Sequence, residues 1–160
     1  MGNALKYLLF IVLFALLGFT REFIFVNINS HLYNLYYQRQ EHTLPYSMLF
    51  LLNYDYKTIY FSKYGLTVAY FLGYLMTSYF SVKIICNTKS FSRWIIYIYA
   101  LLILCSSIIM LYNYLFNHQY NGEEYTLSRW IMGIAQSPLV AFFMIASHTL
   151  YNKFNIDKTL

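Results

Sequence analysis

A few polar residues lie where long apolar runs end, and these are the candidates for catalysis or binding. Arg21 and Glu22 follow the first apolar run directly, and charged residues at membrane depth mark functional sites. With His31, Arg129 and Gln136 they would line an outward-facing polar site. Such a site predicts a membrane-embedded enzyme or a carrier of lipids or small molecules. In the simpler interpretation, Arg21 and Glu22 lie at the membrane interface and Arg129 belongs to a helix start capped by Thr126 or Ser128.

Catalytic and metal-binding patterns are weak in this sequence. The residue types that bind zinc occur in the segments predicted to lie outside, at His31, Glu41, His42, His118, Glu123 and Glu124. None of them has the H-x-x-x-H or H-E-x-x-H spacing of a helical site, so we expect no metal and no cofactor. The two cysteines, Cys86 and Cys105, have no paired spacing and no histidine close in sequence. We expect no catalytic residue.

The composition indicates a membrane protein. Of 160 residues, 59% are hydrophobic and 11% charged, whereas soluble domains carry about 25% charged residues. Mean hydropathy is +0.45. These values exclude a free soluble enzyme, a disordered chain and a disulfide-stapled secreted domain.

Four apolar runs are long enough to cross a bilayer, which takes about 20 residues. They cover residues 4–20, 64–82, 94–115 and 130–152. The sequence therefore predicts an all-α fold: a polytopic membrane protein with four transmembrane helices in a bundle, forming one domain over residues 1–160. We interpret the first run as an uncleaved anchor, since bulky Phe19 stands where a signal peptide has small residues.

The segment of residues 21–63 is too polar to span and too aromatic to be a free loop. Its first part, up to Tyr37, either prolongs the first helix or lies flat at the interface. Pro45 suits the first turn of a short interfacial or re-entrant helix. Tyrosine rings favour the headgroup zone, so we expect this segment to form an aromatic outer cap.

Basic residues predict the orientation of the spans. Residues 1–6, 83–93 and 152–160 carry six basic residues in 26 positions, whereas residues 21–63 and 115–129 carry five in 58. The denser side faces the cytoplasm by the positive-inside rule. Both termini should then be cytoplasmic. Because the net charge of +5 lies entirely on that side, it indicates anionic lipids and not a nucleic-acid partner.

Small residues four positions apart predict where helices pack. The second span carries Gly65, Ala69, Gly73, Thr77 and Ser81, and the fourth carries Gly133, Ser137 and Ala141. In lipid, small residues let helix backbones approach closely. Pro138 removes a backbone donor and predicts a kink beside Gln136.

Two runs carry a resemblance to known proteins. TREFIFVNIN at residues 20–29 and SRWIMGIAQSPLVAFF at residues 128–143 resemble segments of small bacterial membrane proteins. Chain size, four spans and richness in Tyr, Phe, Asn and Ile are similar to the short membrane proteins associated with exosortase systems. Exosortases themselves resemble transpeptidases with Cys, Arg and His at the outer face. Neither cysteine here is placed there, so the resemblance implies a partner and carries over no functional residue.

These observations favour a non-catalytic accessory or scaffold protein of a larger cell-envelope complex of the secretion or sorting type. Its expected partners are the lipid bilayer and a membrane protein or a second copy of the chain. The membrane enzyme or carrier described above is the alternative function.

Overall fold

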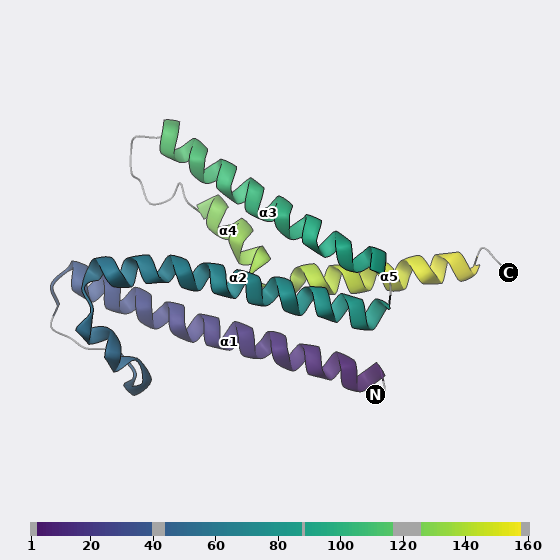
Figure 1. The fold of residues 1–160 in the computed structure, drawn as a ribbon, viewed down its shortest axis with the longest axis horizontal. Coiled ribbons are helices and arrows are strands. Elements are labelled where there is room, and N and C mark those ends of the chain that lie inside the picture. The colour runs from purple at the N-terminus through teal and green to yellow at the C-terminus, as the bar shows by residue number, and fades with distance from the viewer. Residues whose placement is uncertain (1–2, 40–43, 88, 117–125, 158–160) are drawn as a thin grey trace. The chain divides into compact units, whose positions relative to one another are not determined.

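The described part of the chain is helical. The computed structural model describes residues 3–39, 44–87, 89–116 and 126–157, and no strand occurs within these ranges. Five α-helices and one 3-10 helix follow each other within these ranges (Figure 1). They are α1 (Asn3–Tyr36), η1 (Tyr46–Asn53), α2 (Tyr56–Cys86), α3 (Lys89–Phe116), α4 (Thr126–Ala135) and α5 (Leu139–Asp157). The predicted all-α class is confirmed.

Among the described residues, three helices are long and apolar enough to cross a membrane, and they cover Ala4–Tyr36, Tyr56–Cys86 and Phe91–Tyr112. A fourth candidate is the pair Leu127–Ala135 and Leu139–Lys153, whose axes are bent by 59°. The pair is either one broken span or a re-entrant loop. Three or four candidate spans are compatible with a membrane-embedded helical protein.

The first helix is much longer than the predicted span. α1 has 34 residues and ends at Tyr36, so Arg21 and Glu22 lie inside it. Of the two alternatives for the segment up to Tyr37, the structure has the one in which the first helix is prolonged. The sequence explains the continuation, because no proline occurs before Pro45. At about 1.5 Å per residue α1 is roughly 50 Å long, which exceeds a hydrocarbon core of about 30 Å.

The fourth apolar run is divided into two helices. α4 ends at Ala135 and α5 begins at Leu139, so residues 136–138 separate them. The Ser137 hydroxyl donates to the carbonyl of Ile134 at 2.7 Å, and the amide of Phe142 donates to the carbonyl of Pro138 at 3.0 Å. The first bond gives the Ile134 carbonyl a partner that the missing N–H of Pro138 cannot supply, and the second is a regular helical bond at the start of α5.

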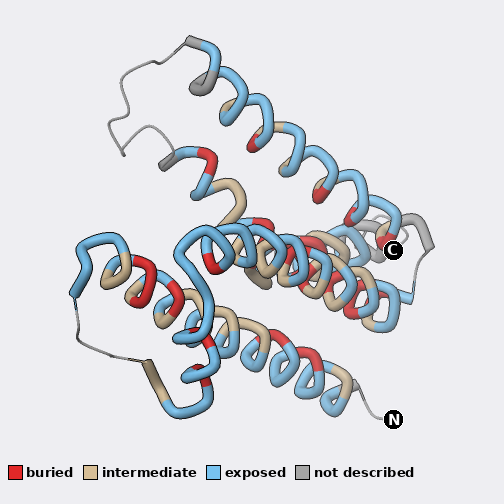
Figure 2. The backbone as a smooth tube through the Cα atoms, turned by 60° about the vertical axis from the view of Figure 1, so that its left-hand side comes forward, coloured by how far each residue is buried: buried red, intermediate tan, exposed pale blue. Residues whose placement is uncertain are grey.

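The chain divides into two compact units, which we describe separately. The central unit is Ala15–Leu72, and the discontinuous unit combines Met1–Phe14 with Gly73–Leu160. In the central unit, η1 buries Met48 and Leu51 in a core with residues of α1 and α2, and Figure 2 shows this burial along α1 and η1. The other core members are Ile28, Leu32 and Ile59, with Ile24, Leu35, Leu44 and Leu66 packed around them.

In the discontinuous unit, hydrogen bonds between side chains join neighbouring helices. The hydroxyls of Ser78 in α2 and Tyr99 in α3 lie 2.9 Å apart, and both residues are fully buried. The hydroxyls of Ser106 in α3 and Ser128 in α4 lie 2.7 Å apart. Ser128 Oγ also reaches the carbonyl of Ser106, so Ser128 joins two helices. Hydroxyl pairs of this kind satisfy polar groups that neither lipid nor an apolar core can satisfy.

The start of α2 is capped by a carboxylate. Asp55 precedes the helix, and Thr58 donates to its Oδ1 through both its hydroxyl and its amide. The hydrogen bond from the Thr58 side chain lowers the pKa of Asp55 below its ordinary value of 3.8. The cap therefore stabilises the fold above that value, and its contribution is lost as the pH falls through the lowered pKa.

We expect Asp55→Ala to lower the melting temperature at neutral pH, because the first turn of α2 loses its acceptor. Asp55→Asn should keep the acceptor and abolish the part of the pH dependence that Asp55 causes. Thermal denaturation of the protein in detergent, followed by circular dichroism at neutral and acidic pH, measures both effects. Equal melting temperatures for Asp55→Ala and the parent at neutral pH would contradict the assignment.

Candidate functional site

The residues predicted to form a polar site are divided between the two units. Arg21, Glu22 and His31 lie on α1 in the central unit. Arg129 lies on α4 and Gln136 directly after it, both in the discontinuous unit. The convergence of the five residues, on which an enzyme or carrier depends, stays a prediction.

In the central unit, the three polar residues have different surroundings. The Arg21 guanidinium lies 5.7 Å from the centre of the Phe25 ring, one helical turn further along. Glu22 is exposed, whereas His31 is only 4% exposed. His31 lies three residues after core residue Ile28, a spacing that puts the two on the same side of α1.

In the discontinuous unit, Arg129 and Gln136 also differ. Arg129 is exposed, and the residue before it, Ser128, is the one that bonds to Ser106. Gln136 is 4% exposed at the break between α4 and α5, and its backbone N–H donates to the carbonyl of Met132 at 2.9 Å. The buried Gln136 side chain thus lies where the helix is interrupted, and a buried amide there is expected to need a hydrogen-bond partner.

The stripe of small residues on α2 is buried at one end and exposed at the other. Gly65 and Ala69 are exposed, Gly73 and Thr77 are half-buried, and Ser81 is fully buried. A Cβ added at Gly65 would meet no heavy atom within 4 Å in the described part of the chain. The exposed end of the stripe is therefore open to an approaching helix.

The shorter stripe near the break shows the same contrast. Gly133 is half-buried, and a Cβ added there would likewise meet nothing within 4 Å among the described residues. Ser137 is half-buried, whereas Ala141 is fully buried. Among Gly133, Ser137 and Ala141, a larger side chain would therefore be accommodated least easily at Ala141, because that position is already packed.

The possible metal ligands are only partly described. Within residues 3–39, 44–87, 89–116 and 126–157, no group of three His, Cys, Asp or Glu side chains is close enough to hold a metal ion. Glu41, His42, His118, Glu123 and Glu124 lie outside the described residues. The expectation of no metal therefore stays a prediction. Cys86 is buried in α2 and Cys105 half-buried in α3, both as free thiols.

Aromatic side chains gather in the central unit. Six tyrosines form what we call the tyrosine cluster: Tyr33, Tyr36, Tyr37, Tyr56, Tyr60 and Tyr64. The centroids of successive rings lie 4.6 to 6.3 Å apart. The hydroxyls of Tyr60 and Tyr64 lie 2.8 Å apart, and the Arg39 guanidinium lies 5.2 Å from the Tyr33 ring centre. All six rings are at least 38% exposed. The cluster is the closest structural counterpart of the predicted aromatic cap.

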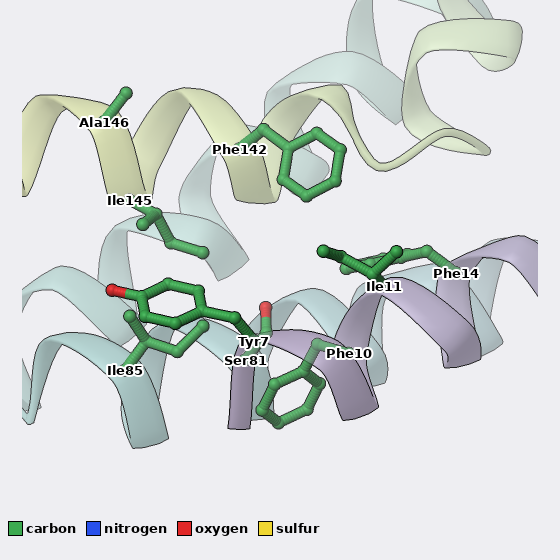
Figure 3. Close-up of a pocket in the computed structure, with 9 residues that line it drawn as sticks. All are labelled: Tyr7, Phe10, Ile11, Phe14, Ser81, Ile85, Phe142, Ile145 and Ala146. Carbon is green, nitrogen blue, oxygen red and sulfur yellow. The ribbon is translucent and has the colours of Figure 1, made fainter. Parts of the chain in front are cut away.

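The discontinuous unit contains a cavity that no sequence pattern indicated. Its volume is about 270 Å³, and Figure 3 shows side chains of α1, α2 and α5 around it. Its lining is apolar apart from the hydroxyls of Tyr7 and Ser81. The lining residues are Tyr7, Phe10, Ile11, Phe14, Ser81, Ile85, Phe142, Ile145 and Ala146. The Ser81 hydroxyl donates to the carbonyl of Ser78 at 2.9 Å, within its own helix. No local signal would have found this cavity, because its residues look like ordinary membrane-helix residues.

The described residues thus offer an apolar cavity, an exposed tyrosine cluster and an open small-residue stripe. Each is suited to binding apolar or amphipathic molecules or another helix. Comparisons with known proteins add no further assignment. No protein-family model, no curated protein and no solved structure matches this chain.

Proposed function

We propose that this chain is a non-catalytic accessory or scaffold protein of a larger cell-envelope complex, of the secretion or sorting type. In this proposal it is a four-helix membrane bundle in the cytoplasmic membrane of a bacterium, with both termini in the cytoplasm. It binds lipid over much of its surface and a membrane protein, or a second copy of itself, over the rest.

The observation that carries the proposal is the exposed end of the α2 stripe. Gly65 and Ala69 lie on one face of a candidate membrane helix, and both are exposed. In lipid, helices associate through close packing of backbones, which small residues permit. An exposed small-residue face on a membrane helix therefore supports a partner helix as its cover.

The apolar exposure of the candidate membrane helices also supports the proposal. In the most apolar 18-residue windows of Ala4–Tyr36 and Phe91–Tyr112, only 11% and 17% of the residues are buried within the chain. Such surfaces need lipid or other membrane helices around them. Most of the apolar surface of these two helices is thus available for contact with lipid or with a partner helix.

Ala69→Ile tests the proposed helix contact. We expect the variant to lose association with its partner by about tenfold, which corresponds to roughly 1.4 kcal/mol of lost packing. The matched control is Ala100→Ile on α3, since Ala100 is also an exposed alanine in a candidate membrane helix. The measurement is the fraction of chain in a higher-mass complex after cross-linking in native membranes and purification in mild detergent.

Two outcomes would contradict the proposal. One is a parent protein recovered only as a free monomer after cross-linking. The other is an equal loss of complex in the Ala69→Ile and Ala100→Ile variants, since this would show a general effect of bulk on α-helical surfaces.

A further inference from the structure

We propose that the Glu22 carboxylate of α1 binds a basic side chain on a membrane helix of a different protein. This protein is the partner that the proposed function requires, so the inference rests on that function. Three features of the central unit support it: the depth of Glu22 in the membrane, its exposure on an apolar helix face, and the direction in which its side chain leaves the helix.

Two lysines of α2 indicate which part of the central unit lies in hydrocarbon. Residues 64–82 between Lys63 and Lys83 carry no charge. At about 1.5 Å per residue the two lysines are roughly 30 Å apart along the helix, which matches the thickness of a hydrocarbon core. Lysine side chains at the ends of such a stretch extend into the headgroup layer. Lys63 therefore marks one edge of the core.

The pairing of α1 with α2 places Glu22 well inside that edge. The two helices run antiparallel (Figure 1), and the rings of Phe25 and Tyr70 lie 6.0 Å apart. Tyr70 follows Lys63 by seven residues along α2, so this contact lies within the core. Glu22 precedes Phe25 by three residues, which puts it on the deeper side. We therefore place Glu22 roughly 10 Å inside the edge of the hydrocarbon core.

Glu22 lies on an outward, otherwise apolar face of α1. Phe19 and Val26, three residues before it and four residues after it, share this face. Their side chains are 73% and 53% exposed, and Glu22 is exposed as well. Among the described residues, none forms a hydrogen bond or an ion pair with the Glu22 carboxylate. At this depth the face is covered by lipid tails or by another membrane helix.

The side chain of Glu22 is directed away from the headgroups. Side chains of an α-helix lean toward its N-terminus, and α1 begins on the far side of the core from Lys63. Glu22 therefore leans toward the middle of the bilayer. Arg21 differs, because its guanidinium lies 5.7 Å from the ring centre of Phe25, one turn nearer the edge. Successive residues of a helix do not face each other, so Arg21 is not positioned to pair with Glu22.

The chemistry of this position favours a basic residue of another protein. A carboxylate surrounded by lipid tails is costly, and a cationic partner within hydrogen-bond reach offsets the cost. Headgroup amines lie outside the hydrocarbon core and do not reach this depth. Of the basic residues in the central unit, Arg21 is the one at this depth, and it is half-buried against Phe25. A second copy of the central unit would thus not present a suitable cation.

Photo-crosslinking in native membranes tests the proposal, using the full chain with benzoylphenylalanine in place of Phe19. Mass spectrometry should identify a partner peptide that contains Lys or Arg within an apolar stretch. Glu22→Gln, which removes the charge, should reduce the cross-linked complex roughly tenfold. Glu22→Asp keeps the charge and should reduce it by less than about threefold. Thr20→Ala removes another exposed polar side chain from the same turn and should have no effect.

Equal amounts of complex for the parent and a helical Glu22→Gln variant would overturn the proposal. Cross-links only to lipid, to a second copy, or to the chain's own α4, where Arg129 lies, would overturn it as well. If Glu22→Gln loses its helical circular dichroism, Glu22→Leu replaces it, and an undiminished complex would have the same meaning. A complex that depends on Ala69 and not on Glu22 would reject this inference alone, whereas the absence of any complex would reject the proposed function too.

Discussion

A green fluorescent protein fused after Leu160 is expected to fluoresce, and a tag placed before Met1 is expected to be protected from protease added outside the cell. Both results follow if α4 and α5 together form one broken span, since four crossings return the chain to its starting side. The basic residues near the two ends and between α2 and α3 predict that this side is the cytoplasm. The effect is all-or-none, because a reporter on the outer side does not mature.

The break at residues 136–138 makes this experiment decisive. The axes of the two helices are bent by 59°, which suits either a broken span or a re-entrant loop. At about 1.5 Å per residue, α4 and α5 have lengths of roughly 15 and 28 Å, enough in sum for a core of about 30 Å. A truncated fusion after Tyr54, between η1 and α2, should stay dark as the control. Termini found on opposite sides would leave three spans and a re-entrant pair.

Tyr99→Ala is expected to destabilise the discontinuous unit by about 3–5 kcal/mol, the cost of removing a large buried aromatic side chain. Tyr99 is fully buried, and its hydroxyl bonds to that of Ser78 on the neighbouring helix. The variant therefore leaves a void and also breaks a link between α2 and α3. Unfolding in detergent, followed by circular dichroism or by protection of introduced cysteines, measures the loss.

Two matched variants divide this effect into its parts. Tyr97→Ala changes the same residue type two positions earlier on α3, where the ring is 63% exposed, so we expect a change within about 0.5 kcal/mol. Tyr99→Phe removes only the hydroxyl and should cost about 0.5–1.5 kcal/mol. Similar losses for Tyr97→Ala and Tyr99→Ala would contradict the burial found for Tyr99.

Helix bounds show where local sequence information suffices and where it fails. Hydropathy located the candidate spans because apolar content is a property of each segment alone. It ended the first apolar span at Thr20, since Arg21 and Glu22 interrupt the apolar run, and it left open whether the helix continues to Tyr37. The backbone continues to Tyr36 because nothing there breaks a helix, and because the last turns of α1 pack against η1.

The candidate polar site shows a second limit. Residue type singled out His31 and Gln136, and both are buried. Type alone did not separate them from Glu22 and Arg129, which are exposed. Glu22 and His31 lie on different faces of α1, and Gln136 lies at the break between α4 and α5. Which of these positions is buried depends on packing partners distant in sequence.

By itself, the sequence determined that this chain is helical, apolar enough for a membrane, and interrupted at Pro138. These properties depend on each segment's own hydropathy and backbone chemistry. Only the tertiary structure decided that Ser106 bonds to Ser128, that the α2 stripe is open at Gly65, and that residues of three helices line one apolar pocket. Each of these depends on side chains that meet from separate helices, and short-range patterns do not specify which faces meet.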